Sequence, residues 1–120
     1  MTTNSEPIYS SLALDPGYID LVVEFVSEFP IKAETIRRCI ADENLALLQR
    51  TMHQMRGACG GYGFPTLSES AGKVEERLKA GQTLESVEAN ISEFINLLAR
   101  ATAEKPQLSH DDYEPRGAMV

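Results

Sequence analysis

The sequence predicts an all-α protein: an antiparallel up-down four-helix bundle with an additional shorter N-terminal helix. Apolar residues recur at intervals of three and four through most of the chain, as on the buried face of a helix. No segment sustains the period-two alternation that is typical of a half-buried strand. The breaks between periodic segments are short, which favours antiparallel neighbours. At 120 residues, the chain has the length of one domain that can bury a core.

The first two helices are expected between residues 16 and 41. Asp15 is predicted to cap the first helix, with Pro16 as its first helical residue. Residues 18–29 are apolar over most of the helix circumference, so this helix packs between others or presents a patch to a partner. Pro30 fits either the first turn of a second helix or a kink, and the apolar face of that helix carries Ala33, Ile36 and Ile40.

The remaining three helices show the clearest periodicity. Asn44 can cap the third helix, which ends in the glycine-rich break at residues 60–63. Gly81 is expected to end the fourth helix, and the fifth begins near Thr83. The predicted core positions are Leu45, Leu48, Met52, Met55, Cys59 and Tyr62 in the third helix, Phe64, Leu67, Ala71, Val74 and Leu78 in the fourth, and Leu84, Val87, Ile91, Phe94, Leu98 and Ala101 in the fifth.

Polar, proline-containing ends flank this helical region. We expect a flexible lead-in at residues 1–15, the bundle at 16–104 and a flexible tail at 105–120. His110 lies in the tail beside two aspartates and is interpreted as a solvated tail residue.

Charge and cysteine content exclude several classes of function. A formal net charge of −7 repels nucleic acid and anionic membrane surfaces, so neither is an expected partner. Cys39 and Cys59 are too few for a disulfide framework and lack zinc-site spacing, so buried free thiols are expected. The N-terminus lacks the features of a signal peptide and no apolar run is long enough to span a bilayer. These observations predict a cytoplasmic protein.

His53 is the residue on which the chemical interpretation depends. On a helical wheel it points about 130° away from the centre of the apolar stripe, into solvent. Gly57 and Gly60 lie on its face, although a glycine inside a helix costs about 1 kcal/mol relative to alanine. Clearance for a partner that approaches the imidazole would offset this cost. Gln49, Arg50 and Arg56 lie within helix-neighbour reach.

An exposed imidazole among arginine and glycine residues is suited to phosphoryl transfer. A neutral ring nitrogen is a nucleophile that can form a covalent intermediate. The guanidinium groups of Arg50 and Arg56 could neutralise a phosphoryl group or a partner's carboxylates. The transfer needs mainly positioning and charge neutralisation, and a partner can supply the metal. From spacing alone, an ordinary surface histidine beside a packing glycine is an equally good interpretation.

The segment from His53 to Leu67 closely resembles the active segment of histidine phosphotransfer (HPt) domains. That pattern is a histidine, an aliphatic residue two positions later, a basic residue three later and a glycine four later, followed by a glycine-rich bend. Met55, Arg56 and Gly57 occupy these positions, where the family more often has leucine and lysine at the first two. Exchange of lysine for arginine could alter how the phosphoryl group is held. The resemblance extends over roughly residues 16–104.

The resemblance implies a phosphorelay intermediate. His53 would accept a phosphoryl group from a receiver-domain aspartate and pass it to another such aspartate, without autonomous kinase activity or a nucleotide. The implied partners are response-regulator receiver domains and a hybrid histidine kinase, with no cofactor on this chain and magnesium on the receiver. Receivers dock on the family's histidine helix and an adjacent helix, for which Val22, Phe25 and Val26 are candidates. A monomer is the expected state.

Two rival functions are considered. A metal-binding bundle enzyme would use Glu-x-x-His pairs, but Arg50 precedes His53 by three residues and Gln107 precedes His110 by three. A helical adaptor that docks receiver domains without carrying phosphate is the alternative, and loss of function on replacement of His53 with glutamine would separate the relay from it.

Overall fold

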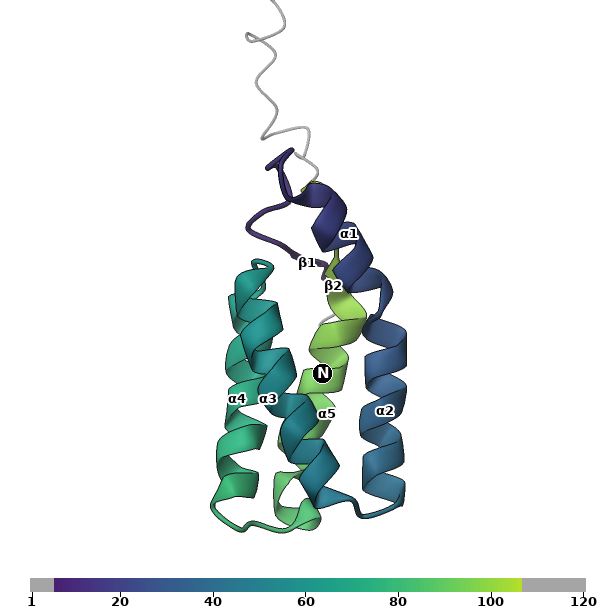
Figure 1. Cartoon of the computed structure of the whole chain (residues 1–120), viewed down its shortest axis with the longest axis vertical. Coiled ribbons are helices and arrows are strands. Elements are labelled where there is room, and N and C mark those ends of the chain that lie inside the picture. The colour runs from purple at the N-terminus through teal and green to yellow at the C-terminus, as the bar shows by residue number, and fades with distance from the viewer. Residues whose placement is uncertain (1–5, 107–120) are drawn as a thin grey trace, which may run out of the picture.

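The computed structural model describes residues 6–106, which are mostly helical (Figure 1). The predicted all-α class is therefore confirmed. Residues 1–5 and most of the predicted tail, with His110, lie outside the described residues. The elements in chain order are β1 (Ile8–Tyr9), α1 (Ile19–Ser27), α2 (Phe29–Ala41), α3 (Leu45–Gly61), α4 (Pro65–Lys79), α5 (Leu84–Arg100) and β2 (Ala101–Thr102).

Helices α2 to α5 lie side by side and enclose the core. Helix α3 packs against α4, α4 against α5, and α2 against both α3 and α5 (Figure 1). Nearly all predicted core positions of α3, α4 and α5 are buried or packed against the core. Leu45 is the exception, with 40% of its surface exposed, because it is the first residue of α3 and lies at the end of the bundle.

Most helix boundaries lie at the residues that the sequence predicts to mark them. The Asn44 side chain accepts a hydrogen bond from the Leu47 backbone N–H at 3.1 Å, which satisfies one free donor of the first turn. Thr83 does the same for Ser86 at the start of α5. Pro30 lies in the first turn of α2, and Gly81 follows the end of α4 with φ of 85°.

The predicted start of the first helix is wrong. Helix α1 begins at Ile19, and its N-cap position is held by Tyr18 without a side-chain cap. The Asp15 carboxylate accepts a hydrogen bond from the Gly17 backbone N–H at 2.8 Å. The backbone carbonyl of Asp15 accepts one from the Ile19 backbone N–H at 2.9 Å. Aspartate readily forms such turns with its own following residues, so Pro16 belongs to a turn that precedes the helix.

Residues 8–13, called here the N-terminal strap, pack against the turn between α3 and α4. Strand β1 pairs in parallel with β2, with Ile8 opposite Ala101. The Ser10 hydroxyl donates to the carbonyl of Tyr62 at 2.7 Å, and Ser10 is buried. These ordered contacts lie within the stretch expected to be a flexible lead-in, and a two-residue strand gives no periodicity by which a sequence could reveal it.

Gly63 makes the approach of the strap possible. Its φ is +87°, and a Cβ there would lie 2.5 Å from the Ser10 hydroxyl oxygen and 2.9 Å from the Ser11 backbone nitrogen. The Gly63 carbonyl accepts the Ser11 N–H at 2.8 Å. Both the left-handed conformation and the close backbone approach require glycine at this turn.

Candidate functional site

His53 projects from the middle of α3 into solvent, as predicted. Its side chain is 70% exposed, while Met52 and Met55 on either side of it are buried. Burial of these neighbours fixes the rotation of α3 about its axis, so the imidazole is presented on a rigid element. The ring is therefore accessible to another macromolecule without any opening of the bundle.

A buried carboxylate from α4 holds the imidazole. The Glu75 side chain is 1% exposed, and its Oε2 lies 2.7 Å from Nδ1 of His53. The other carboxylate oxygen, Oε1, accepts from Nη1 of Arg56 at 3.2 Å. Lys79 Nζ lies 3.3 Å from Oε2. Glu75 thus joins α3 to α4 and pairs with three nitrogen-bearing side chains.

The electrostatic environment keeps Glu75 ionised. Burial favours the neutral carboxyl and acts to raise its pKa, but hydrogen bonds from His53, Arg56 and Lys79 act the other way, and the pKa of Glu75 lies below its ordinary value. An ionised carboxylate only accepts hydrogen bonds, so Nδ1 of His53 carries the proton. The lone pair of the imidazole then lies on Nε2, the nucleophilic nitrogen of an exposed ring.

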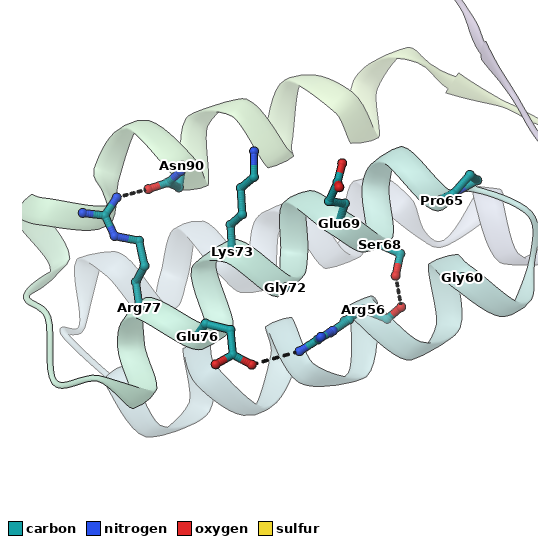
Figure 2. Close-up of a pocket in the computed structure, with 10 residues that line it drawn as sticks. All are labelled: Arg56, Gly60, Pro65, Ser68, Glu69, Gly72, Lys73, Glu76, Arg77 and Asn90. Carbon is teal, nitrogen blue, oxygen red and sulfur yellow. Dashed lines mark hydrogen bonds and ion pairs between the residues drawn. The ribbon is translucent and has the colours of Figure 1, made fainter.

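Arg56 lies across α4 rather than extending into solvent. Its Nη1 also donates to Oε2 of Glu76 at 3.2 Å, and hydrogen bonds with Glu75 and Glu76 raise the pKa of the Arg56 guanidinium. The Ser68 hydroxyl donates to the Arg56 carbonyl at 2.7 Å. Figure 2 shows the side chain beside Gly72, at one edge of an open groove of about 720 Å³ between α3, α4 and α5.

The two predicted glycines have different surroundings. A Cβ at Gly57 would meet no atom within 4 Å, which agrees with an open approach to the exposed face of α3. A Cβ at Gly60 would lie 3.3 Å from the Ser68 hydroxyl oxygen, so Gly60 also allows close packing of α3 on α4. Among the residues that the structure describes, neither Gln49 nor Arg50 joins the side-chain network around Glu75; Arg50 is exposed and Gln49 is partly buried.

The candidate docking residues of α1 are corrected in part. Val22 is fully buried and cannot contact a partner, because it faces the core. Phe25 and Val26 are partly buried and pack against the core, and Phe25 stacks on Tyr62 with ring centroids 4.4 Å apart. The large apolar side chains that are about half exposed in this region are Tyr18, which precedes α1, and Leu21 and Val23 within it.

Residues of α4 complete the site, and none of them was predicted. They are Ser68, Gly72, Glu75, Glu76 and Lys79. One signal in the sequence was available for Glu75. It lies four residues after Ala71, on the apolar stripe of α4, and an acidic residue on a buried face is rarely left without a partner.

Two negative findings apply to residues 6–106. No group of three or more histidine, cysteine or acidic side chains is arranged to hold a metal ion in that range. Nor does any helix there combine the length and apolar character needed to cross a bilayer.

Comparison with models of protein families identifies the family of the chain. A family model described as the Hpt domain matches residues 20–104, so the chain belongs to the Hpt domain family. Hpt domains are the histidine phosphotransfer modules of two-component signalling. They carry phosphoryl groups without being kinases, and they interact with receiver domains and histidine kinases in phosphorelays. Searches of curated proteins and of solved structures gave no match.

Proposed function

We propose that His53 is the phosphoacceptor, which receives a phosphoryl group from an aspartate of one receiver domain and passes it to an aspartate of another. One observation carries the proposal. The imidazole of His53 is 70% exposed, and its Nδ1 donates a hydrogen bond to the ionised carboxylate of Glu75, whose side chain is 1% exposed. The exposed ring is accessible to a receiver, and the buried carboxylate fixes its tautomer.

The transfer follows from the state of the two ring nitrogens. The lone pair on Nε2 of His53 attacks the phosphorus of the receiver's aspartyl phosphate, a P–N bond forms, and the P–O bond to the aspartate breaks. The aspartate leaves as a carboxylate. The proton on Nδ1 stays in place, so the phosphorylated ring carries positive charge next to Glu75, 2.7 Å from Nδ1. Donation to a second receiver runs through the reverse steps.

The other predicted residues support this transfer in distinct ways. Gly57 leaves the space beside the imidazole open, and Gly60 lets α4 approach α3. Arg56 neutralises Glu75 and Glu76, and therefore limits repulsion of an incoming anion. Arg50 and Gln49, one turn before His53, are available to a receiver's acidic or phosphoryl groups. We expect no cofactor on this chain and magnesium on the receiver.

The proposal includes the arrangement of the helices. We take α2 to α5 as an antiparallel up-down four-helix bundle, with α1 as the additional shorter helix. Connections of three or four residues between successive helices support it, as do the contacts of each of the four with its neighbours. The module is proposed to act as a monomer.

Transfer to the chain from a phosphorylated receiver domain tests the proposal. The protein is incubated with the receiver and magnesium, and its intact mass is followed together with the acid lability of the added phosphate. We expect one phosphoryl group on the wild type and none on His53→Gln. A matched control, His53→Gln with Gln54→His, moves the imidazole to the next exposed position, away from Glu75, and should also stay unmodified.

The same experiment also tests the alternative function, a helical adaptor that binds receiver domains without carrying phosphate. If a broad panel of receivers binds the folded wild type and His53→Gln equally and transfers phosphate to neither, the relay is contradicted and the chain acts as a docking module.

A further inference from the structure

Four residues of α4 surround Arg56. They lie on one face of the helix and are Ser68, Gly72, Glu75 and Glu76. Ser68 bonds the backbone carbonyl of Arg56, and the two glutamates bond its guanidinium. Gly72 lies beside the arginine stem (Figure 2).

Gly72 leaves the space that the arginine stem fills. A Cβ there would lie 3.1 Å from Nε of Arg56 and 3.3 Å from Cδ, closer than ordinary van der Waals contact, and 3.4 Å from Cζ, at the limit of such contact. These three atoms are its nearest neighbours, so an added methyl group would push on Arg56 and on no part of the core.

Helix geometry does not explain this glycine. Gly72 is in the interior of α4 and is not among the residues with positive φ, so alanine could adopt its backbone conformation. Glycine is less favourable than alanine at such a position. This cost in helix stability is explained if the absence of a side chain at position 72 makes room for Arg56.

Arg56 connects Gly72 to the histidine. One guanidinium nitrogen bridges Glu75 Oε1 and Glu76 Oε2, each at 3.2 Å, while the second oxygen of Glu75 holds Nδ1 of His53 at 2.7 Å. To make room for a methyl group at position 72, Arg56 must move by a few tenths of an ångström, and we expect that movement to disturb these bonds. The displacement would therefore reach Glu75 and, through it, the imidazole.

We propose that Gly72 is a positioning residue. It leaves space on the surface of α4 for the side chain of Arg56, which in turn holds Glu75 in place against His53. The dependence is specific to arginine. A lysine has no branched, planar head, so it can change rotamer and still place its ammonium near Glu75. The expected effect on transfer rests on the proposed function of His53, whereas the effect on the ring does not.

A double-mutant cycle tests the pairing. Gly72→Ala, Arg56→Lys and the combination are compared in phosphotransfer rate from a phosphorylated receiver and in thermal stability. We expect Gly72→Ala to slow transfer by about three- to tenfold, because a displacement of 1 Å costs about 100-fold and a few tenths of an ångström are needed here. Its melting temperature should not fall. In the Arg56→Lys protein the same change should leave the rate unaltered.

Ring-nitrogen NMR of His53 gives a readout that needs no phosphate. Gly72→Ala should increase the population of the Nε2–H tautomer in the arginine protein and leave it unchanged in the lysine protein. Gly61→Ala, whose Cβ meets no atom within 4 Å, is the matched control. Equal effects of Gly72→Ala in both backgrounds, or none in either, would overturn the inference. If the wild type accepts no phosphate, the proposed function fails while the tautomer comparison still decides the role of Gly72.

Discussion

Replacement of Glu75 with glutamine tests the buried carboxylate at the centre of the site. The change preserves size and one carbonyl oxygen but removes the negative charge that pairs with His53, Arg56 and Lys79. Hydrogen bonds to a charged group contribute about 1.5–3 kcal/mol each, and exposed ion pairs about 0.2–1 kcal/mol. The three partners are 47–70% exposed, so water replaces much of what is lost. We expect a loss of about 1–2 kcal/mol in the free energy of unfolding at pH 7, or about 4–8 °C in melting temperature for a domain of this size.

The stabilisation by Glu75 should depend on pH, and the direction of its pKa shift says how. The pKa of Glu75 is depressed in the folded protein from its ordinary value of 4.5, so the unfolded chain takes up the proton first as the pH falls. The stabilisation is therefore complete above about pH 4.5 and is lost as the pH drops through the folded pKa. Glutamine does not titrate, so the stability difference between the two proteins should shrink in acid.

Urea denaturation of wild type and Glu75→Gln at a series of pH values from 7 to 3 measures that difference. Equal stability at pH 7, or a difference that persists undiminished at pH 3, would refute the assignment of Glu75 as an ionised buried partner. Phosphotransfer by the variant, measured alongside, should be slower than in the wild type, since Nδ1 of His53 loses its charged acceptor.

Other substitutions test the fold. Phe94→Ala, at a fully buried position, should cost about 3–5 kcal/mol in urea denaturation; a loss below 1 kcal/mol would contradict its place in the core. Asn44→Ala removes the α3 cap and should cost about 0.5–2 kcal/mol by the same method. Gly63→Ala should destabilise more than Gly81→Ala, because both have positive φ but only the first would meet other atoms; equal melting temperatures would argue against the packing of the strap. Burial raises the pKa of Cys59 to about 12, so its thiol should resist alkylation at pH 8 until the protein is unfolded, as intact mass would show.

Features encoded in local periodicity were predictable. The exposure of His53 followed from its phase relative to Met52 and Met55, both buried, because 3.6 residues per turn fixes where every side chain of a helix points. Likewise, Asn44 and Thr83 cap the helices that they precede, since capping depends on residues within one turn.

Features that depend on the register of two helices were not predictable from one sequence. Periodicity does not reveal that Glu75 lies opposite His53, and the reason for Gly72 appears only when Arg56 crosses it. Asp15 failed as a cap for a different reason: its carboxylate does accept the Gly17 N–H, but the turn that it closes ends before the helix, whose N-cap position is Tyr18. The strap needs Gly63 and the end of α5, both distant in sequence from Ser10.

The pairing of β1 with β2 has a consequence for how the protein folds. Helix contacts among the described residues mostly join elements that are consecutive in sequence, whereas the two strands join segments near the beginning and the end of the described residues. Closing so long a loop carries an entropic cost, and two residue pairs repay little of it until the helices are in place. The strap should then be the last segment to order and the first to open, with backbone amides at Tyr9 and Ser11 that exchange with solvent well before those of α3.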